Sequence, residues 1–457
     1  AIEDIFKYNL TGIDIDTRAK QLATFALLLK ACQKDNSFTD AHSMPKVYDM
    51  PEPYKDKEHM ASNLSEFLIG SNKETIEELS EAIELMDDAQ NIGSIMKFNI
   101  SERTRNIVAV RIDEYEKEYF LSENITGLMP YMRIILSLTQ HYSALVMNPP
   151  YMGGRNMNNV LSKYVKDNYE EGKADLFSVF MLLAIDTLQA NGKYGMINMQ
   201  SWMFLSSFEK LRKDLIDNSQ IDNMLQRGPQ TFDELSGEVV QNIAFVISKK
   251  KPNNGATYFR LVDGKNCTEK KRIFIKSKDV EGNKIYYSNV SQKNFEKIPG
   301  SPIGYWVSEK ILAIYNARPL LSNFIIREGL KTGDNNRFIR NWYEISSNLI
   351  NRKWFPHTKG GNMRRWYGNN DTLLNYENNG KKLKAFLGSS ATGENEYFRP
   401  YITYGRIGSG KFSSRYVSSG SIPNMAGLSI ISKTNNNNSL LIALAITKSK
   451  IFQVLLK

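Results

Sequence analysis

The sequence has little of the chemistry that metal sites and disulfide scaffolds require. Its 457 residues include two cysteines, Cys32 and Cys267, and four histidines, and none of these residues has the spacing of metal ligands. We therefore expect neither a structural zinc site nor a disulfide framework, and we predict no metal-binding residues. A reducing compartment such as the cytoplasm fits this cysteine usage best.

Long apolar runs are also missing. No stretch approaches the length of a membrane-spanning helix, and no secretory signal opens the sequence, so no membrane partner is predicted. The chain starts at Ala1, just before a strand-like segment, and it ends in the apolar stretch "IFQVLLK". We interpret both ends as those of a piece cut from a longer protein.

Acidic residues are scarce in the last third of the chain. From residue 301 onward, 22 Lys and Arg stand against 8 Asp and Glu, a net charge of +14, whereas residues 1–300 carry 37 against 41, a net charge of −4. A basic region of this size favours a polyanionic partner such as nucleic acid. A solvated surface explains the charge alone equally well.

Strand and helix patterns alternate over the first 250 residues. The apolar spacing predicts helices over residues 17–34, 173–190 and 207–218, and Asn191-Gly192 is expected to close the second of them. Strands are predicted over residues 10–15, 94–98, 143–148, 193–200, 221–225 and 239–248. This alternation predicts an α/β fold in which helices cover the faces of a sheet.

The domain organisation follows from changes in composition. Residues 1–250 are predicted to form the α/β domain, with residues 40–90 as a helical insertion. Lysines cluster near residue 250, and Asn, Gly and aromatic residues become dense beyond it. We therefore predict a transition over residues 251–300 and an α+β domain over residues 301–457.

The stretch "ALVMNPPYMGG", residues 144–154, carries the clearest chemistry. An apolar strand ends at Asn148, and ligands of open α/β sheets bind beyond the carboxyl ends of the strands. The Asn148 side chain and the Pro149 carbonyl offer two fixed acceptors, which suit an exocyclic amino group, because prolines stiffen the turn. Tyr151 offers a flat face on which a planar base can stack. A simple turn at the strand end is the alternative.

This segment resembles the catalytic motif of the amino-group DNA methyltransferases, Asn/Asp-Pro-Pro-Tyr/Phe after an apolar strand. The resemblance implies catalytic roles for Asn148, Pro149, Pro150 and Tyr151, and S-adenosylmethionine as the cofactor. In "GIDIDTRAKQLATFALLLKA", residues 12–31, it implies that Asp14 holds the cofactor ribose and that Ile15 lies against the adenine. The remaining positions that match the pattern are Phe98 and Phe180 for the cofactor and Phe232 for the target base.

Five fragments in order resemble one family more closely: "NPPYMGGRNMN", "KADLF", "FDELSGEVVQNIAFV", "LKTGDNNRFIRNWYEI" and "KGGNMRRWYGN". Together they are similar to the PglX family, the adenine-specific methyltransferases of the BREX bacteriophage-defence systems. The resemblance implies a bacterial, cytoplasmic enzyme with a Rossmann-like S-adenosylmethionine-dependent methyltransferase sheet, which methylates N6 of a flipped adenine, and further phage-defence proteins as partners. The glycine-rich cofactor loop of such enzymes would lie before Ala1, so the sheet is expected to be incomplete at its N-terminus. Lys97 stands where the family usually has an aspartate.

The basic region resembles a target-recognition domain for double-stranded DNA. Basic residues hold phosphates, while Arg and Asn can also bind base edges. For Trp342, Trp354 and Trp366 we expect core positions. The residues predicted to contact DNA are Lys331, Arg337, Arg340, Arg364 and Arg365.

Two alternatives stay open at this point. The same tetrapeptide serves methyltransferases that act on RNA bases or on protein glutamine, because their acceptors are also planar amines or amides. The chain could also be a DNA-binding or specificity module whose catalytic half is incomplete. The basic second domain argues against the first alternative, and the missing glycine-rich loop supports the second.

Overall fold

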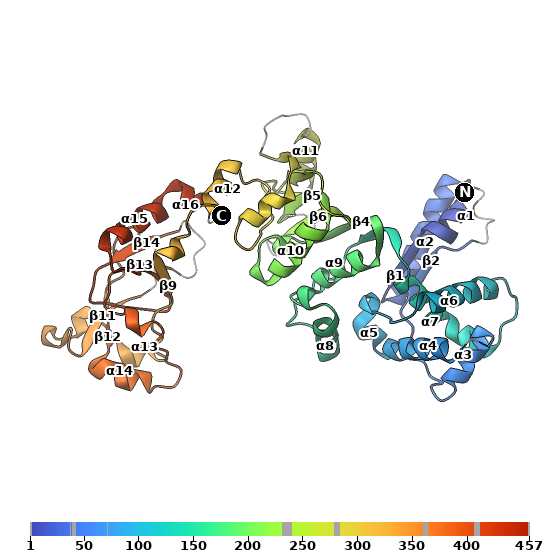
Figure 1. Cartoon of the computed structure of the whole chain (residues 1–457), viewed down its shortest axis with the longest axis horizontal. Helices are drawn as coiled ribbons and strands as arrows, with labels where there is room; N and C mark the ends of the chain where they lie inside the picture. Colours follow the sequence, from blue (N-terminus) through green and yellow to red (C-terminus); the bar gives the residue numbers. More distant parts are fainter. Residues whose placement is uncertain are drawn as a thin grey trace. The chain divides into compact units, whose positions relative to one another are not determined.

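The computed structural model describes all residues except 1, 37, 39–42, 71, 231–239, 278–283, 360–363, 406–411 and 456–457. The chain divides into two compact units, Ala1–Asn316 and Ala317–Lys457 (Figure 1). The first unit holds the predicted catalytic loop, and the second holds the basic region.

A six-stranded mixed sheet forms the centre of the first unit, with the strand order β3-β4-β6-β5-β7-β8. β3 pairs in parallel with β4, and β5 pairs in parallel with β7, whereas the other neighbouring pairs are antiparallel. The strands are β3 (Tyr142–Met147), β4 (Leu188–Met199), β5 (Gln220–Gly228), β6 (Asn242–Ser248), β7 (Ala256–Arg260) and β8 (Tyr286–Val290). Together with its flanking helices, this sheet confirms the predicted α/β class.

Two helices that precede strands of this sheet pack against it. α9 (Leu176–Thr187) precedes β4, and α10 (Glu209–Asn218) precedes β5, as Figure 1 shows. Their apolar residues, with Phe177 and Leu215 among them, lie in one buried cluster with the inward side chains of the strands. Burial of this kind stabilises the layered arrangement by roughly 2 kcal/mol for each large apolar side chain.

A parallel pair of strands, β1 (Thr11–Asp14) and β2 (Lys46–Asp49), lies outside this sheet. After β2 comes a helical lobe with an apolar core of its own. Its helices are α3 (Met60–Leu68), α4 (Lys73–Leu85), α5 (Ala89–Ile92), α6 (Glu102–Tyr115), α7 (Glu123–Thr139) and α8 (Asn159–Asn168). Residues 40–90 were expected to form only a helical insertion, but they also supply β2.

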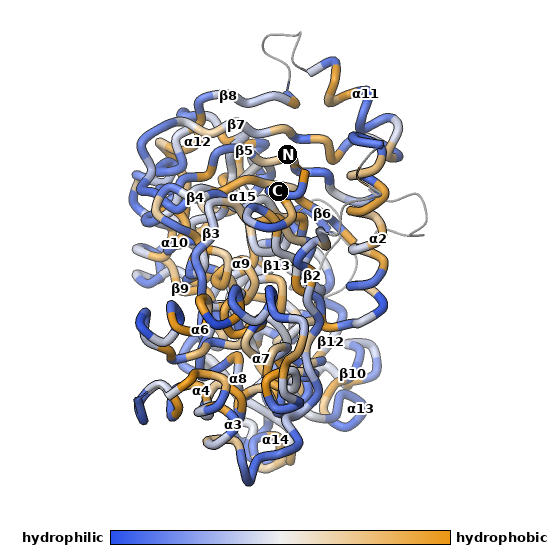
Figure 2. Tube along the Cα trace, turned by 90° about the vertical axis from the view of Figure 1, so that its right-hand side faces the viewer, coloured by the Kyte–Doolittle hydropathy of each residue, from blue (hydrophilic) through white to orange (hydrophobic). Residues whose placement is uncertain are grey.

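Helix α2 (Thr17–Lys34) follows β1, and the Asp16 side chain caps its first turn by accepting a hydrogen bond from the Arg18 amide at 2.7 Å. Its side chains Leu22, Phe25 and Leu29 are 70%, 59% and 48% exposed. Figure 2 shows hydrophobic residues along the length of this helix. In the described residues, β1 and β3 each pair with one neighbouring strand only, and Val146 of β3 is 89% exposed.

The stretch expected to be a transition, residues 251–300, extends the sheet of the first unit. Its described part contains β7, helix α11 (Cys267–Ser277) and β8. Helix α12 (Glu309–Tyr315) follows, and the second unit begins only at Ala317. The strand pairing between β5 and β7 is the reason for this difference from the expected boundary.

The second unit contains two four-stranded sheets, with the orders β10-β12-β11-β15 and β14-β13-β16-β9. The strands are β9 (Phe324–Arg327), β10 (Ile339–Asn341), β11 (Trp354–Thr358), β12 (Thr372–Asn375), β13 (Tyr401–Gly405), β14 (Ser414–Val417), β15 (Ile422–Pro423) and β16 (Gly427–Ser432). The helices are α13 (Asn335–Phe338), α14 (Glu377–Lys384), α15 (Asn437–Lys448) and α16 (Lys450–Leu455). This is the predicted α+β composition.

Two local predictions were wrong. Residues 94–98 form no strand, because Gly93–Ile95 make a turn of 3-10 helix and extended chain follows. Asn191-Gly192 does not close the helix over residues 173–190, because α9 ends at Thr187. The pair lies in an irregular part of β4, where the φ angle of Asn191 is 64°. The Lys249 side chain binds the carbonyls of Asp186 and Leu188 there and satisfies the end of α9.

Candidate active site

The predicted catalytic loop leaves the sheet at the carboxyl end of β3. The strand ends at Met147, one residue before Asn148, as the sequence predicted. Asn148 and Pro150 are exposed, and Pro149 between them is buried. The loop is therefore anchored through one proline ring, and the Asn148 amide faces solvent, where a ligand can reach it.

Tyr151 closes one side of this loop with its ring half-exposed. Its hydroxyl lies 3.3 Å from the Asn148 side-chain oxygen and 3.3 Å from the Ile197 carbonyl. The ring makes an edge contact with Phe177, with centroids 6.3 Å apart and planes at 88°. Burial raises the pKa of the phenol, so Tyr151 stays neutral at physiological pH.

Asp175 holds the loop against α9. Its side chain accepts hydrogen bonds from the amides of Met152, at 3.0 Å, and Phe177, and it caps the helix. The Gly154 amide donates to the Ala174 carbonyl at 3.0 Å, and the Leu176 amide donates to the Met152 carbonyl at 2.9 Å. Burial raises the pKa of Asp175 although these amide bonds favour its charged form. The turn is thus fixed by backbone contacts on both sides.

Gly154 is required here by close backbone approach, which gives a matched pair of variants. A Cβ atom at Gly154 would lie 2.6 Å from the Lys173 carbonyl oxygen, whereas one at Gly153 would meet only the Asp175 carboxylate at 3.8 Å. We expect Gly154→Ala to displace the loop and to lower the rate of any reaction catalysed at this loop about tenfold or more, because a shift of about 1 Å in a site has such effects. Gly153→Ala should keep near-normal activity. Equal rates for the two variants would contradict this role of Gly154.

A polar network behind Tyr151 was missed by the sequence analysis. The Asn242 side-chain amide donates to the Tyr151 hydroxyl at 3.3 Å, and Asn242 is fully buried. Its side-chain oxygen has no hydrogen-bond partner in the described part of the chain. A second chain of contacts runs from Gln241 through Gln200 and Gln226 to the Tyr305 hydroxyl. The sequence contains amide residues where β4 ends and also where β6 begins, and both positions lie at one edge of the sheet. This clustering was the sequence signal that could have predicted the network.

The residues predicted to hold the cofactor lie on neighbouring elements. Asp14 ends β1 with an exposed carboxylate, which accepts the Asp16 amide at 2.9 Å. Ile15 is 44% exposed, and its side chain lies beside Gly93. The turn at Gly93–Ile95 packs against both β1, which ends at Asp14, and α9.

Phe98 and Phe180 are both half-buried. Phe98 packs against the core of the helical lobe, and Phe180 packs against that core and also against the core of the large sheet. Phe180 therefore contacts two cores, and part of its side chain is still accessible.

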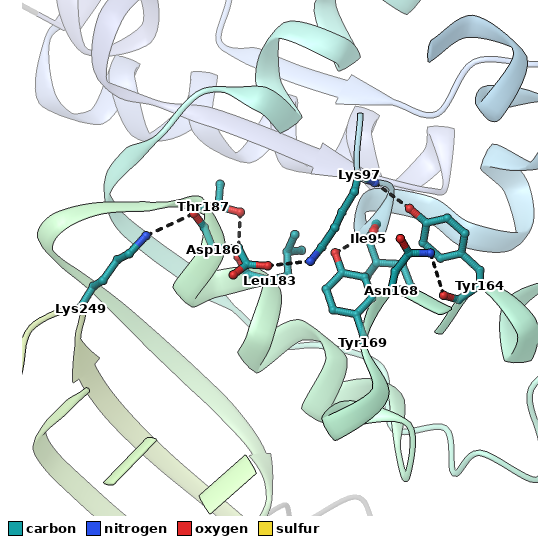
Figure 3. Close-up of polar contacts among 9 residues, drawn as sticks. All are labelled: Ile95, Lys97, Tyr164, Asn168, Tyr169, Leu183, Asp186, Thr187 and Lys249. Carbon is teal, nitrogen blue, oxygen red and sulfur yellow. Dashed lines mark hydrogen bonds and ion pairs between the residues drawn. The ribbon is translucent and has the colours of Figure 1, made fainter. Parts of the chain in front are cut away.

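Lys97, the departure from the family pattern, joins three elements in Figure 3. Its ammonium group lies 2.8 Å from the Asp186 carboxylate of α9 and 4.2 Å from the ring centroid of Tyr169. Its backbone amide donates to the Tyr164 hydroxyl at 2.7 Å. Lys97 thus ties the segment after the Gly93–Ile95 turn to α9 and to the end of α8.

The predicted DNA-contacting residues lie in two groups in the second unit, and Phe232 lies outside the described residues. Lys331 and Arg337 are exposed near the start of α13, where the Arg337 guanidinium lies 5.3 Å from the Phe386 ring centroid. Arg340 is half-buried and donates to nearby carbonyls. Arg364 and Arg365 are exposed in the chain that leads to β12.

One expectation for this unit was wrong for two of the three tryptophans. Trp354 is buried in β11, with 8% of its surface exposed, as expected. Trp342 and Trp366 are each 58% exposed, and so are their neighbours Tyr343 and Tyr367, at 70% and 72%. Both pairs follow basic residues on short turns, which place the aromatic rings at the surface.

Three further properties of the described residues bear on function. Cys32 and Cys267 are both free thiols. No cluster of three or more metal-ligating side chains occurs in the described part of the chain. None of the helices seen there is both long and apolar enough to span a bilayer.

Comparisons with known proteins agree on one class. The profile of the Eco57I restriction-modification methylase family matches residues 8–232. The chain is 33% identical over 477 aligned residues to the adenine-specific methyltransferase PglX of Lacticaseibacillus casei (strain Zhang), covering 98% of this chain and 39% of that protein. It is 32% identical, with the same coverage, to the adenine-specific methyltransferase BrxX of Escherichia coli O9:H4 (strain HS). The solved Type IIL restriction-modification enzyme MmeI in complex with DNA aligns at 12% identity and a TM-score of 0.40, covering 94% of this chain and 63% of that one.

The matched profile shows that residues 8–232, which contain the loop after β3, are similar to methylases of the restriction-modification type. Over 98% of its length the chain is also similar to the adenine-specific methyltransferases PglX and BrxX, which confirms the resemblance found in the sequence. It spans 39% of the length of these two relatives.

Proposed function

We propose that this chain carries the catalytic loop and the DNA-recognition unit of an enzyme that transfers a methyl group from S-adenosylmethionine to N6 of adenine. The adenine is rotated out of duplex DNA, and the reaction serves defence against bacteriophages in the bacterial cytoplasm, together with further defence proteins. One observation carries this proposal: the exposed Asn148 amide lies at the carboxyl end of β3 beside the accessible face of Tyr151.

The loop residues act on the adenine amino group by position and hydrogen bonding. The Asn148 side-chain oxygen and the Pro149 carbonyl accept the two amino hydrogens, and the nitrogen lone pair then points away from them. In the free protein the Tyr151 hydroxyl shares the Asn148 oxygen through a contact of 3.3 Å, which the amino group replaces. Tyr151 holds one face of the base, and Asn242 holds the Tyr151 hydroxyl from behind. When the methyl donor is reactive, fixed geometry of this kind supplies most of the rate enhancement.

The residues present fit one part of the cofactor. When bound, S-adenosylmethionine supplies a methyl group on a sulfonium sulfur, which is a good leaving group. The exposed Asp14 carboxylate at the end of β1 suits two ribose hydroxyls, and Ile15 suits the adenine face. The unpaired edges of β1 and β3 and the exposed apolar residues of α2 are consistent with a cofactor pocket that a further strand would complete.

Nucleic acid is the substrate class that the charge distribution favours over protein, and we propose duplex DNA as this nucleic acid. The second unit carries 21 Lys and Arg against 7 Asp and Glu, a net charge of +14, whereas the first unit carries 38 against 42, a net charge of −4. Lys331, Arg337, Arg364 and Arg365 are exposed and available for phosphates. A protein substrate would gain nothing from this surface.

The substrate test is an assay with S-adenosylmethionine labelled in its methyl group, which offers duplex DNA, RNA and protein side by side. It uses the longest natural protein that contains these residues, because the chain spans 39% of its relatives. We expect label only in DNA, recovered as N6-methyladenine after digestion. Label in RNA or in glutamine would refute the proposed substrate.

A second candidate is a DNA-binding module without activity of its own, and the unpaired edge of β1 favours it for the 457 residues alone. Calorimetry separates the two functions. Heat on titration with S-adenosylmethionine favours the enzyme, whereas retained DNA binding without cofactor binding favours the module.

A further inference from the structure

Arg415 is a buried cation without a countercharge. It lies on β14, and only 3% of its surface is exposed. One guanidinium nitrogen, Nη2, donates to the Lys359 carbonyl at 3.5 Å, and the Nε atom has no partner in the described residues. Burial of an unpaired guanidinium is unfavourable, so a cation in this position favours a nearby anion.

Lys448, at the end of α15, lies close to the same strand. Its ammonium group donates to the Ser414 carbonyl and lies 5.4 Å from the ring centroid of Trp366. Burial, followed by the positive charges of Arg365 and Arg415, lowers the pKa of Lys448 to about 8. Three cations therefore act on one another at this place.

Trp366 fixes Arg365 to the strand that carries Arg415. The Trp366 carbonyl accepts a hydrogen bond from the Tyr416 amide at 3.0 Å. The Ser413 hydroxyl donates to the carbonyl of Arg364, one residue before Arg365. Arg365 and the Trp366 indole are both exposed. The surface above Arg415 is thus basic, aromatic and open to solvent.

The segments that build this cluster contain no carboxylate. Residues 397–457 include eight Lys and Arg and no Asp or Glu, and residues 345–370 include five Lys and Arg and no Asp or Glu. No ion pair joins Arg365, Arg415 or Lys448 to an acidic side chain among the described residues. No acidic side chain of these segments neutralises the cluster, which favours an anionic ligand at this place.

We propose that Arg365, Lys448 and Trp366, above the buried Arg415, form a phosphodiester site that anchors one strand of duplex DNA to the second unit. Arg365 and Lys448 donate to the phosphate oxygens, and Arg415 adds positive potential from below. The indole lies against the adjoining sugar and keeps the Lys448 ammonium in place. This inference rests on the proposed DNA-binding function and names a contact that serves it.

The test compares two double variants with the same loss of charge. Arg365→Gln/Lys448→Gln alters the proposed site, and Lys381→Gln/Lys382→Gln removes two exposed charges on α14. Binding of a labelled duplex to the 457-residue chain is measured by fluorescence anisotropy at several salt concentrations. We expect the first variant to bind about tenfold more weakly, with a slope of log K against log salt smaller by about one, as for one lost phosphate contact. The control should change affinity less than about twofold.

Each outcome decides the matter. If both double variants lose the same DNA affinity, the effect comes from the total charge of the unit, and the proposed site is refuted. Normal binding by the first variant overturns the site while the proposed function stands, and no duplex binding by the unmodified chain overturns both. A charge-conserving variant, Arg365→Lys/Lys448→Arg, should bind within about threefold of the unmodified chain, since the phosphate contact depends mainly on charge. If it loses as much affinity as the Gln variant, the two positions serve packing and the proposal fails.

Discussion

Replacement of Asn148 by alanine should abolish detectable methyl transfer and leave DNA binding intact. The variant removes the side-chain oxygen that we assign to the adenine amino group, while the Pro149 carbonyl remains. Loss of one preorganised hydrogen-bonding group in an active site costs about 10² to 10³ in rate. Because Asn148 is exposed and lies after the end of β3, its truncation should not disturb the sheet. The rate is measured with labelled cofactor, and DNA affinity is measured in parallel.

Asn148→Asp is the matched control for this experiment. An aspartate keeps an acceptor oxygen in the same place and replaces the amide nitrogen by a second, negatively charged acceptor, so it should retain more activity than alanine. Tyr151→Phe separates a second effect, because it keeps the stacking face and frees the Asn148 oxygen from the hydroxyl contact at 3.3 Å. An alanine variant that methylates DNA at the normal rate would remove Asn148 from the mechanism.

The position of the loop after β3 could be predicted from the sequence because its signals are local. The apolar residues before Asn148 predict a strand, and the two prolines predict where it ends. The role of Asn242 could not be predicted in this way. It lies 91 residues from Tyr151, and the two residues meet only because β4 and β6 pair side by side. Strand order in a mixed sheet depends on such long-range pairing, which the pattern of a single segment does not contain.

The aromatic residues of the second unit were harder to place. Trp354 lies in a strand, so its expected burial was correct, but Trp342 begins a turn of 3-10 helix, Trp366 lies in irregular chain, and both rings are exposed. Composition predicts that a large apolar ring tends to be buried, and it does not report what covers the ring. In this basic unit, exposed rings beside arginines are consistent with a surface that contacts DNA.

The stretch over residues 251–300 was misplaced for a related reason. Its lysines and asparagines are typical of a linker, but its described part is held to the sheet by buried polar side chains. The Gln292 side chain accepts the Ile221 amide at 3.0 Å and donates to the carbonyls of Ile216 and Ser219 at 2.8 and 2.7 Å. Polar residues that satisfy buried backbone groups cannot be told from solvated ones in the sequence alone.

Replacement of Arg212 by methionine should lower the free energy of unfolding of the first unit by about 4 kcal/mol. Arg212 is 1% exposed, and its guanidinium donates to the carbonyls of Trp202, Leu205, Gly300 and Ser301. It therefore ties α10 both to the chain after β4 and to residues near the end of the first unit. A hydrogen bond from a charged donor contributes about 1.5 kcal/mol or more, and buried carbonyls left without a donor add to the loss. Denaturant unfolding, followed by circular dichroism, measures the change.

Two variants on the same helix show whether the several hydrogen bonds of the Arg212 guanidinium are responsible for the stability. Arg212→Lys keeps the charge and reaches fewer carbonyls, so it should lose about half as much stability. Lys213→Ala removes an exposed lysine that pairs with Glu209 at 2.8 Å, and its effect should stay below about 0.5 kcal/mol. A loss for Arg212→Met of less than about 1 kcal/mol would mean that the segment around Ser301 is held to α10 by apolar packing instead. The methionine variant should also lose methyl transfer with its stability, because Trp202 and Leu205 belong to the chain that leaves the edge of the sheet where Tyr151 lies.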